Sequence, residues 1–315
     1  PPTVTVLNPQ SGYSVPENTE LTVTWNATDN ISIDSVITVH YSNDSGNVFI
    51  EVGEFSVEQE QGAFIIPPGS TNNAQLKLAV EDIYENTGEG FSDYFSVTDN
   101  TSPTVTIDTP DNMSIGETVS LTWTASDNNS IEKHKLYYAV NINQTFTLID
   151  SVDGNAISYN WLVPNVVTDS ARIRIETYDS VNLSTADTST YFVIIDEIIP
   201  TIEVLVPAEG YTIPEYGDLT TSWTASDNIA LDSIRAYYSK DGGTSFNWMG
   251  VVSAVDSNYT FTVPFGFTDQ AQVKLEAIDI YGNMGDDLSD YFSVSDNTPP
   301  EISLLAPTTG TGLDI

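Results

Sequence analysis

Apolar and polar residues alternate with a period of two along short stretches of this chain. The alternation is clearest at residues 4–6, 21–25, 76–80, 121–123, 173–175 and 273–275. Clusters of turn-forming residues separate these stretches, as in Asn43-Asp44-Ser45-Gly46 and Lys240-Asp241-Gly242-Gly243. No apolar pattern with the spacing of a helix extends over a useful length. The pattern therefore predicts a protein built from short β-strands.

The strand pattern also predicts the fold class. In the first hundred residues we expect strands at residues 3–8, 20–27, 34–42, 47–52, 62–66, 74–81 and 92–98. About seven short strands per 100 residues, separated by frequent turns, are typical of an immunoglobulin-like sandwich of two antiparallel sheets. We therefore predict an all-β fold of this type.

One tryptophan-centred segment occurs three times in the chain. Trp25-Asn26-Ala27-Thr28-Asp29-Asn30 is repeated with small changes from Trp123 and again from Trp223. A period of about 100 residues is the size of a whole small domain and too long for a solenoid unit. We predict three tandem immunoglobulin-like domains and the first strand of a fourth, at residues 1–98, 99–197, 198–297 and 298–315.

The repeated segments indicate which residues belong to the scaffold. Each tryptophan falls in the middle of the second predicted strand, so we expect Trp25, Trp123 and Trp223 to anchor the core between the two sheets. The linkers between the predicted domains are short and end in proline, which restricts the backbone. They lie at residues 99–103, 196–200 and 296–300. We therefore expect the domains to form a semi-rigid rod.

Acidic residues dominate the charge of the chain. There are 45 Asp and Glu against 8 Lys and Arg, for a formal net charge of −37. Nucleic acid and anionic membrane surfaces are poor partners, because both are bound through clustered cations. Cysteine is absent, which excludes disulfides and cysteine-based zinc sites, and no apolar stretch predicts membrane insertion. Bound divalent cations or a salty medium would relieve the self-repulsion of so many carboxylates.

Three segments of the last repeat resemble a known class of domains. They are Ser222-Trp223-Thr224-Ala225-Ser226-Asp227-Asn228, Tyr237-Tyr238-Ser239-Lys240-Asp241-Gly242-Gly243 and Ala277-Ile278-Asp279-Ile280-Tyr281-Gly282-Asn283. They are similar to tandem prokaryotic Ig-like or fibronectin type III-like repeats, and the similarity covers nearly the whole chain. The resemblance implies a location outside the cell or on its surface. The second repeat departs from the pattern, since Asp179-Ser180-Val181-Asn182 replaces Asp-x-x-Gly-Asn.

The sequence contains no unique polar constellation of the kind that forms a catalytic site. Its two histidines, His40 and His134, occupy positions where the other repeats carry tyrosine or isoleucine. There is no glycine-rich phosphate loop and no GxSxG motif. Residues that recur in every repeat are scaffold, or they form a site used once per repeat. We therefore predict that the chain is not an enzyme.

Two functions remain open at this point. One is a structural segment of an extracellular surface protein, such as an adhesin stalk, a sheath or a filament subunit, whose partners are other copies or a neighbouring surface protein. The alternative is a spacer or carbohydrate-binding accessory domain of a secreted hydrolase, with glycans as partners. Exposed aromatic residues would mark such a site, but we interpret Phe246 and Trp248 as strand packing. Strand exchange through Ile302, Leu304 and Leu305 is a third hypothesis, less simple than the start of a further repeat.

Acidic and amide side chains gather at the predicted junctions. In an Ig-like sandwich, the loops after the second and sixth strands lie at the pole where the chain arrives from the preceding domain. Their oxygens therefore lie near the linker, and Ca²⁺ takes roughly six to eight such oxygen ligands. We predict calcium ligands at Asp99, Asn100, Asp127, Asn128, Asp179 and Asn182, and at Asp196, Glu197, Asp227, Asn228, Asp279 and Asn283. The alternative is that these residues only cap turns.

The sequence also contains candidate glycosylation sites. Asn-x-Ser/Thr occurs at Asn26, Asn30, Asn43, Asn100, Asn112, Asn128, Asn143, Asn182 and Asn258. A glycosylating organism would modify some of them. The abundance of Asn, Ser and Thr in polar loops is the simpler explanation.

Overall fold

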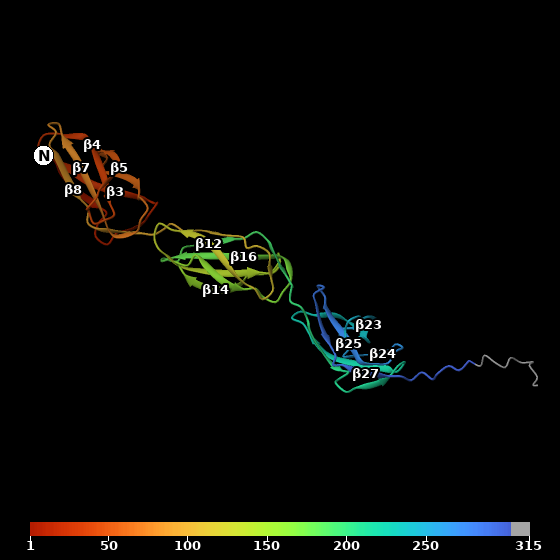
Figure 1. Cartoon of the computed structure of the whole chain (residues 1–315). Coiled ribbons are helices and arrows are strands. Elements are labelled where there is room, and N and C mark those ends of the chain that lie inside the picture. Colours follow the sequence, from red (N-terminus) through yellow and green to blue (C-terminus); the bar gives the residue numbers. More distant parts are fainter. Residues whose placement is uncertain (304–315) are drawn as a thin grey trace, which may run out of the picture. The chain divides into compact units, whose positions relative to one another are not determined.

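The computed structural model describes residues 1–303. The regular structure of these residues is β, apart from one 3-10 turn, η1 (Val57–Gln59), and no described helix is long and apolar enough to cross a membrane. The same arrangement of two sheets occurs three times along the chain (Figure 1), which confirms the predicted all-β tandem sandwich. Residues 298–303 form no strand, and the rest of the predicted fourth-repeat strand, with Leu304 and Leu305, lies outside the described residues.

The first repeat shows the pattern that the others follow. One sheet has the strand order β1-β3-β6, and the other has the order β2-β9-β7-β4-β5, with β8 also paired to β7. The strands are β1 (Thr3–Asn8), β2 (Ser14–Pro16), β3 (Glu20–Thr28), β4 (Ile33–Ser42), β5 (Ile50–Ser56), β6 (Gln61–Ile65), β7 (Thr71–Asp82), β8 (Thr87–Phe91) and β9 (Phe95–Thr98).

The second and third repeats have the same strand orders. The second contains β10 (Thr104–Ile107), β11 (Met113–Ser114), β12 (Thr118–Ser126), β13 (Ile131–Ala139), β14 (Thr147–Asp153), β15 (Ser158–Leu162), β16 (Thr168–Asp179), β17 (Ser184–Thr188) and β18 (Phe192–Ile195). The third contains β19 (Thr201–Val206), β20 (Thr212–Pro214), β21 (Asp218–Ser226), β22 (Leu231–Ser239), β23 (Asn247–Ser253), β24 (Asn258–Thr262), β25 (Thr268–Asp279), β26 (Met284–Leu288) and β27 (Phe292–Ser295).

Contacts within the chain define two compact units. One comprises Pro1–Met113, Thr118–Leu162 and Thr168–Val193, and the other comprises Ser114–Glu117, Val163–Val167 and the chain from Ile194 onward. The domain boundaries at residues 98, 197 and 297 stay a prediction.

Two strands of the first repeat differ from the sequence-based prediction. β5 begins at Ile50 and not at residue 47, because the Asp44 carboxylate accepts hydrogen bonds from the backbone N–H groups of Asn47 and Val48 (3.0 and 2.9 Å) and holds them in a turn. The last predicted strand, residues 92–98, is shorter, because β9 begins at Phe95, and an additional strand, β8, precedes it. A side chain at Gly90 of β8 would place Cβ 2.5 Å from the Val4 carbonyl oxygen of β1, so this strand segment requires a residue without Cβ.

The three repeated tryptophans lie in the cores, as predicted. Trp25, Trp123 and Trp223 are 1%, 2% and 4% exposed. In the second repeat, the His134 ring packs on Trp123 at a centroid distance of 5.3 Å and hydrogen-bonds to the Thr177 hydroxyl at 2.8 Å. Burial lowers the pKa of His134. This histidine is therefore a core residue whose two ring nitrogens both contact the protein.

The aromatic pair of the third repeat fits the packing interpretation only in part. Phe246 is half-buried, and Lys274 Nζ lies 6.0 Å from the centre of its ring. Trp248 in β23 is 53% exposed and packs edge-on against Tyr237 at 5.4 Å. About half of the Trp248 residue is therefore accessible to solvent.

Candidate metal centres

Three aspartates meet where the first repeat leads into the second. Asp99 follows β9, Asp127 follows β12, and Asp179 ends β16. One carboxylate oxygen of each lies within 4.8 Å of the others. We call this group the first acidic cluster. It forms because the loops after β12 and β16 lie at the pole that receives the linker, as the sequence predicts.

Two of these carboxylates have buried oxygens without a hydrogen-bond donor among the described residues. Asp179 is fully buried; its Oδ1 accepts from the N–H groups of Val181 and Leu183 (both 2.9 Å), whereas its Oδ2 has no partner. Asp127 Oδ2 accepts from the N–H of Asn129 at 3.0 Å, whereas its Oδ1 has no partner. Burial, together with the charges of Asp99 and Asp179, raises the pKa of Asp127. Among residues 1–303, no Lys or Arg forms an ion pair with this cluster.

A second acidic cluster occupies the equivalent place before the third repeat. It consists of Asp196, Asp227 and Asp279, again with carboxylate oxygens within 4.8 Å of one another. Asp196 is 7% exposed, and its Oδ1 accepts from the Ile198 N–H at 3.1 Å. Within the part of the chain that the structure describes, Asp196 Oδ2 and Asp227 Oδ1 have no donor. The Asn228 side-chain oxygen is likewise buried and without a partner.

The two clusters differ in the loop that follows β16 in the second repeat and β25 in the third. Asn283 donates through its side chain to Asp279 Oδ2 at 2.8 Å and to the Asp196 carbonyl oxygen at 3.1 Å. Burial alone would raise the pKa of Asp279, but the hydrogen bonds from Asn283 and Tyr281 outweigh it and lower the pKa. In the second repeat Leu183 occupies the position of Asn283, which leaves Asp179 Oδ2 without a donor.

The structure places Asn182, one of the predicted calcium ligands, at a turn position. Asn182 has φ +69° and occupies the position of Gly282, which has φ +93°. Its side chain is exposed. Asn182 therefore shapes the turn, in the left-handed conformation that Asn tolerates better than most residues.

The other candidate ligands outside the aspartates have different neighbours. Asn128 donates its side-chain amide to both carboxylate oxygens of Glu17, at 2.8 and 2.9 Å. The side chain of Asn100 is exposed, and its backbone N–H lies 3.4 Å from Glu17 Oε1. Glu197 is exposed and accepts a hydrogen bond from the Ser114 hydroxyl at 2.6 Å. The structure thus brings the six aspartates together in two groups and places these three residues beside them.

Sequence reasoning missed Glu17, which is fully buried at the end of the first repeat. Its carboxylate accepts hydrogen bonds from the Gly69 N–H, the Thr101 hydroxyl of the linker and the Asn128 amide. Glu215 of the third repeat does the same with the Gly266 N–H (2.8 Å) and the Thr298 hydroxyl. The recurrence of Pro-Glu at residues 16–17 and 214–215 was the signal that could have identified this pair.

The second repeat has isoleucine at both of the equivalent positions. Ile115 donates its N–H to the Ile195 carbonyl (3.0 Å), as Glu17 does to Thr98 (2.9 Å), so the two residues are equivalent. Ile198 stands in the linker where the first junction has Thr101. The carboxylate of Glu17 and the hydroxyl of Thr101 thus both correspond to isoleucine side chains at the second junction.

Removing the Glu17 charge is expected to destabilise the first repeat in a pH-dependent way. Burial would raise the pKa of Glu17, but the hydrogen bonds from Gly69, Thr101 and Asn128 outweigh it and lower the pKa from 4.5 to about 2. A carboxyl whose pKa is lower in the folded state stabilises it above the ordinary pKa, and loses that effect as pH falls towards the folded value. Glu17→Gln should therefore cost about 1.5–3 kcal/mol at pH 7, the usual contribution of hydrogen bonds to a charged group.

Calorimetry of both proteins between pH 7 and pH 2 measures this difference. It should shrink as pH falls from 4.5 to about 2. Glu81→Gln, at an exposed position of β7, is the matched control and should change little. A cost for Glu17→Gln that stays constant over this range would contradict the assignment.

Comparison with known proteins adds a family match. The model of the bacterial Ig domain family matches residues 2–60. No curated protein matches the chain.

Similar solved structures include the fibronectin(III)-like modules of Clostridium thermocellum CbhA, at 19% identity and TM-score 0.28, covering 62% of this chain and 95% of that one. The FN1–FN3 domains of chicken CNTN1 share 10% identity at TM-score 0.33, and the match covers 92% of this chain and 99% of that one. A tetra-tandem repeat from the extending region of a large adhesion protein shares 16% identity at TM-score 0.33, and the match covers 93% of this chain and 74% of that one.

The family match covers β1 to β5 of the first repeat. The second and third repeats share its tryptophan-centred segment and its strand orders. The chain is therefore a tandem array of Ig-like, fibronectin type III-like repeats, the first of which matches the bacterial Ig domain family.

Proposed function

We propose that the chain is a structural segment of an extracellular surface protein and that calcium, bound at the two acidic clusters, limits bending between successive repeats. The observation that carries the proposal is a set of buried carboxylate oxygens in the clusters. These oxygens lie near other carboxylates and accept no hydrogen bond from the described residues. They are Asp127 Oδ1 and Asp179 Oδ2 in the first cluster, and Asp196 Oδ2 and Asp227 Oδ1 in the second. An ionised group buried in this way costs several kcal/mol unless a cation or donors compensate it.

The charges around the clusters support a bound cation. The ion pairs of the described residues involve Lys77, Lys133, Arg174 and Lys274, and none includes one of the six aspartates. The ligands are carboxylate and amide oxygens, which hard cations such as Ca²⁺ prefer. Extracellular modules bind Ca²⁺ with dissociation constants of about 10⁻⁴–10⁻³ M, which matches a protein outside the cell.

A cation at either cluster would join the linker to two loops of the repeat that follows it. In the first cluster Asp99 comes from the linker, whereas Asp127 and Asp179 come from loops of the second repeat. Coordination by all three would restrict rotation of the linker against those loops. The proposed role is therefore mechanical and non-catalytic, and its partners are other copies of the chain or neighbouring surface proteins.

Calorimetric titration with CaCl₂ tests the cation sites directly. The wild-type chain should bind two Ca²⁺, and Asp179→Asn should bind one, because the first cluster loses a buried charged ligand. Asp111→Asn, at an exposed position, is the control and should keep two. No binding by the wild type, or two ions still bound by Asp179→Asn, would contradict the proposal.

Glycosylation is a further part of this proposal. The nine asparagines of the Asn-x-Ser/Thr sequences are all exposed. Asn128 is the least suited to modification, because its amide donates to Glu17.

A further inference from the structure

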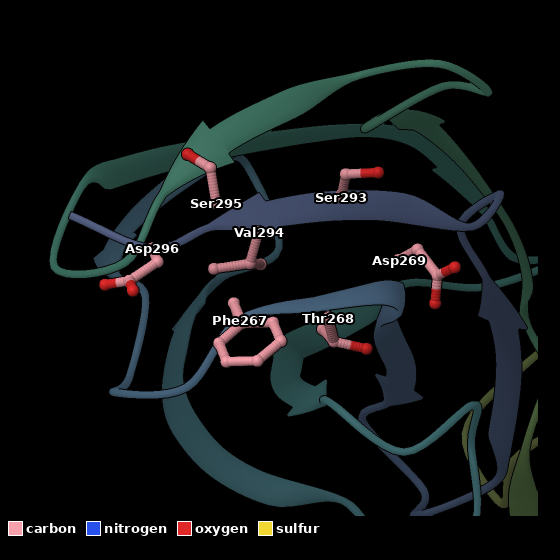
Figure 2. A pocket seen from close by; sticks show the side chains of 7 residues that line it. All are labelled: Phe267, Thr268, Asp269, Ser293, Val294, Ser295 and Asp296. Atoms are coloured by element: carbon pink, nitrogen blue, oxygen red, sulfur yellow. The ribbon is translucent and has the colours of Figure 1, made fainter.

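Most ionisable side chains of this chain lie at the surface, where water solvates both of their protonation states. Figure 2 shows an example in the third repeat, where Asp269 and Asp296 lie at opposite ends of a hollow of about 780 Å³ bordered by β25 and β27, and both are exposed. His134 of β13 differs from them, because it is 1% exposed. Among residues 1–303 it is the one basic side chain that is buried.

His134 belongs to a polar pair that takes the place of an apolar pair in the other repeats. It lies opposite Thr177 of β16 in the paired strands. The equivalent cross-strand pairs are Ile37–Val80 in the first repeat and Ile234–Ala277 in the third. All six residues are at most 2% exposed. The second repeat therefore has a titratable pair in its core where the other two repeats have aliphatic side chains only.

The neighbours of the imidazole ring define its neutral form. Nε2 lies 3.2 Å from the Gly154 carbonyl oxygen, which can only accept a hydrogen bond, so Nε2 carries the hydrogen. In the neutral ring Nδ1 is then an acceptor, and the Thr177 hydroxyl donates to it at 2.8 Å. Both ring nitrogens are therefore satisfied while the ring is neutral.

A second proton on the ring disturbs this arrangement. The new Nδ1–H points at the Thr177 hydroxyl, which has to turn its own hydrogen away, and this hydroxyl has no other hydrogen-bond partner among residues 1–303. The positive charge is buried as well, and no carboxylate of these residues hydrogen-bonds to either ring nitrogen. A buried charge without such a partner is strongly unfavourable.

The charged groups on the neighbouring strands point away from the ring or act on it weakly. Lys133 and Lys135 flank His134 on β13, but their ammonium groups lie over the Tyr178 ring on the other face of the sheet, at 5.3 and 4.8 Å. Glu176 of β16 lies on that face too, since it accepts from the Tyr137 hydroxyl. The ring itself faces two uncharged side chains, Trp123 of β12 and Val152 of β14.

Asp153, at the end of β14, is the acidic group whose charge reaches the ring. Burial lowers the pKa of His134, and the opposing effects of the Gly154 carbonyl and of the Asp153 charge are smaller. A base whose pKa is lower in the folded state contributes stability that is complete above its ordinary pKa, here 6.5, and that is lost as pH falls below this value.

We infer that protonation of His134 destabilises the second repeat and makes it the acid-sensitive segment of the chain. The first and third repeats have Ile37 and Ile234 at this position and lack the effect. In mild acid the second repeat therefore unfolds more readily than the repeats on either side of it, and the array opens first at this repeat. The inference rests on the core of one repeat and does not depend on the proposed cations.

Calorimetry of the whole chain between pH 7.5 and pH 5.5, in chelator, tests the inference. The transition temperature of the second repeat should fall by about 5–10 °C over this range, the shift that corresponds to a tenfold change in the unfolding equilibrium of a domain of this size. The double variant His134→Ile, Thr177→Val, which introduces the pair of the first repeat, should lose this shift. Other titrating groups of the repeat, Asp127 among them, are common to both proteins, so the difference isolates His134.

His40→Tyr is the matched control, because it removes the histidine of the first repeat and introduces the residue of the other two. The second transition should respond to pH in this variant as in the wild type. A second transition that shifts equally in the wild type and in the double variant would overturn the inference.

An NMR titration of the imidazole signals provides a measurement that does not require the double variant to fold. The chain has two histidines, so comparison with His40→Tyr assigns the signals of His134. His134 should take up its proton below pH 6.5. Titration at pH 6.5 or above would overturn the inference. Neither measurement involves calcium, so a failure here leaves the proposed function standing, and a chain that binds no calcium leaves this inference standing.

Discussion

Replacing Trp25 by alanine is expected to lower the free energy of unfolding of the first repeat by about 3–5 kcal/mol. The side chain is 1% exposed and lies in the middle of β3, where it packs in a core with Leu21, Val23 and Phe55. The loss is a large part of the roughly 5–15 kcal/mol that stabilises a typical domain. Calorimetry should show the transition of this repeat at a lower temperature, with those of the others unchanged.

Two further variants separate burial from residue type. Trp25→Phe retains much of the apolar volume and removes an indole N–H that has no partner among the described residues, so it should cost less than Trp25→Ala. Trp248→Ala removes a tryptophan that is 53% exposed and should cost far less than the core substitution. An unchanged transition in Trp25→Ala would show that the strand assignment of the first repeat is wrong.

Removing calcium is expected to destabilise the second and third repeats. At a hundredfold excess over its dissociation constant, an ion that binds only the folded state adds about 2.7 kcal/mol. Chelator should therefore lower the temperatures of both transitions, since each repeat contributes two aspartates to a cluster. Thermal unfolding followed by calorimetry in calcium and in chelator measures the shifts.

Asp279→Asn provides the site-specific version of this experiment. The substitution removes one charge from the second cluster, and the third repeat should then lose its response to calcium while the second keeps it. Asp269→Asn, at an exposed position, should leave both responses intact. Identical transitions in calcium and chelator for the wild type would contradict the assignment.

The alternation of apolar and polar residues, repeated in each segment of about 100 residues, was enough to predict the sandwich and its core. Trp25, Trp123 and Trp223 stand at inward positions of regular strands, and a period of two determines which face is buried. Convergence of the aspartates was also predictable, because the loop that follows each tryptophan strand lies at one pole of every such sandwich. The additional strand β8 was not, since its close approach to β1 at Gly90 depends on packing between strands distant in sequence.

Glu17 shows most clearly what the sequence did not reveal. A lone glutamate ordinarily faces solvent, and only the folded chain shows that the Gly69, Thr101 and Asn128 donors surround it. The assignment of Asn182 as a calcium ligand stays a prediction. Spacing alone did not show that the residue occupies a turn position with positive φ, the position of Gly282 in the third repeat.

Small-angle scattering of the whole chain in calcium and in chelator tests the central claim most directly. If cations at the two clusters restrict the linkers, the largest dimension of the chain should be greater in calcium, and chelator should broaden the distribution of distances. The double variant Asp179→Asn, Asp279→Asn should give the chelator profile even in calcium. Superimposable wild-type profiles in the two solutions would contradict the claim that bound cations hold successive repeats in place.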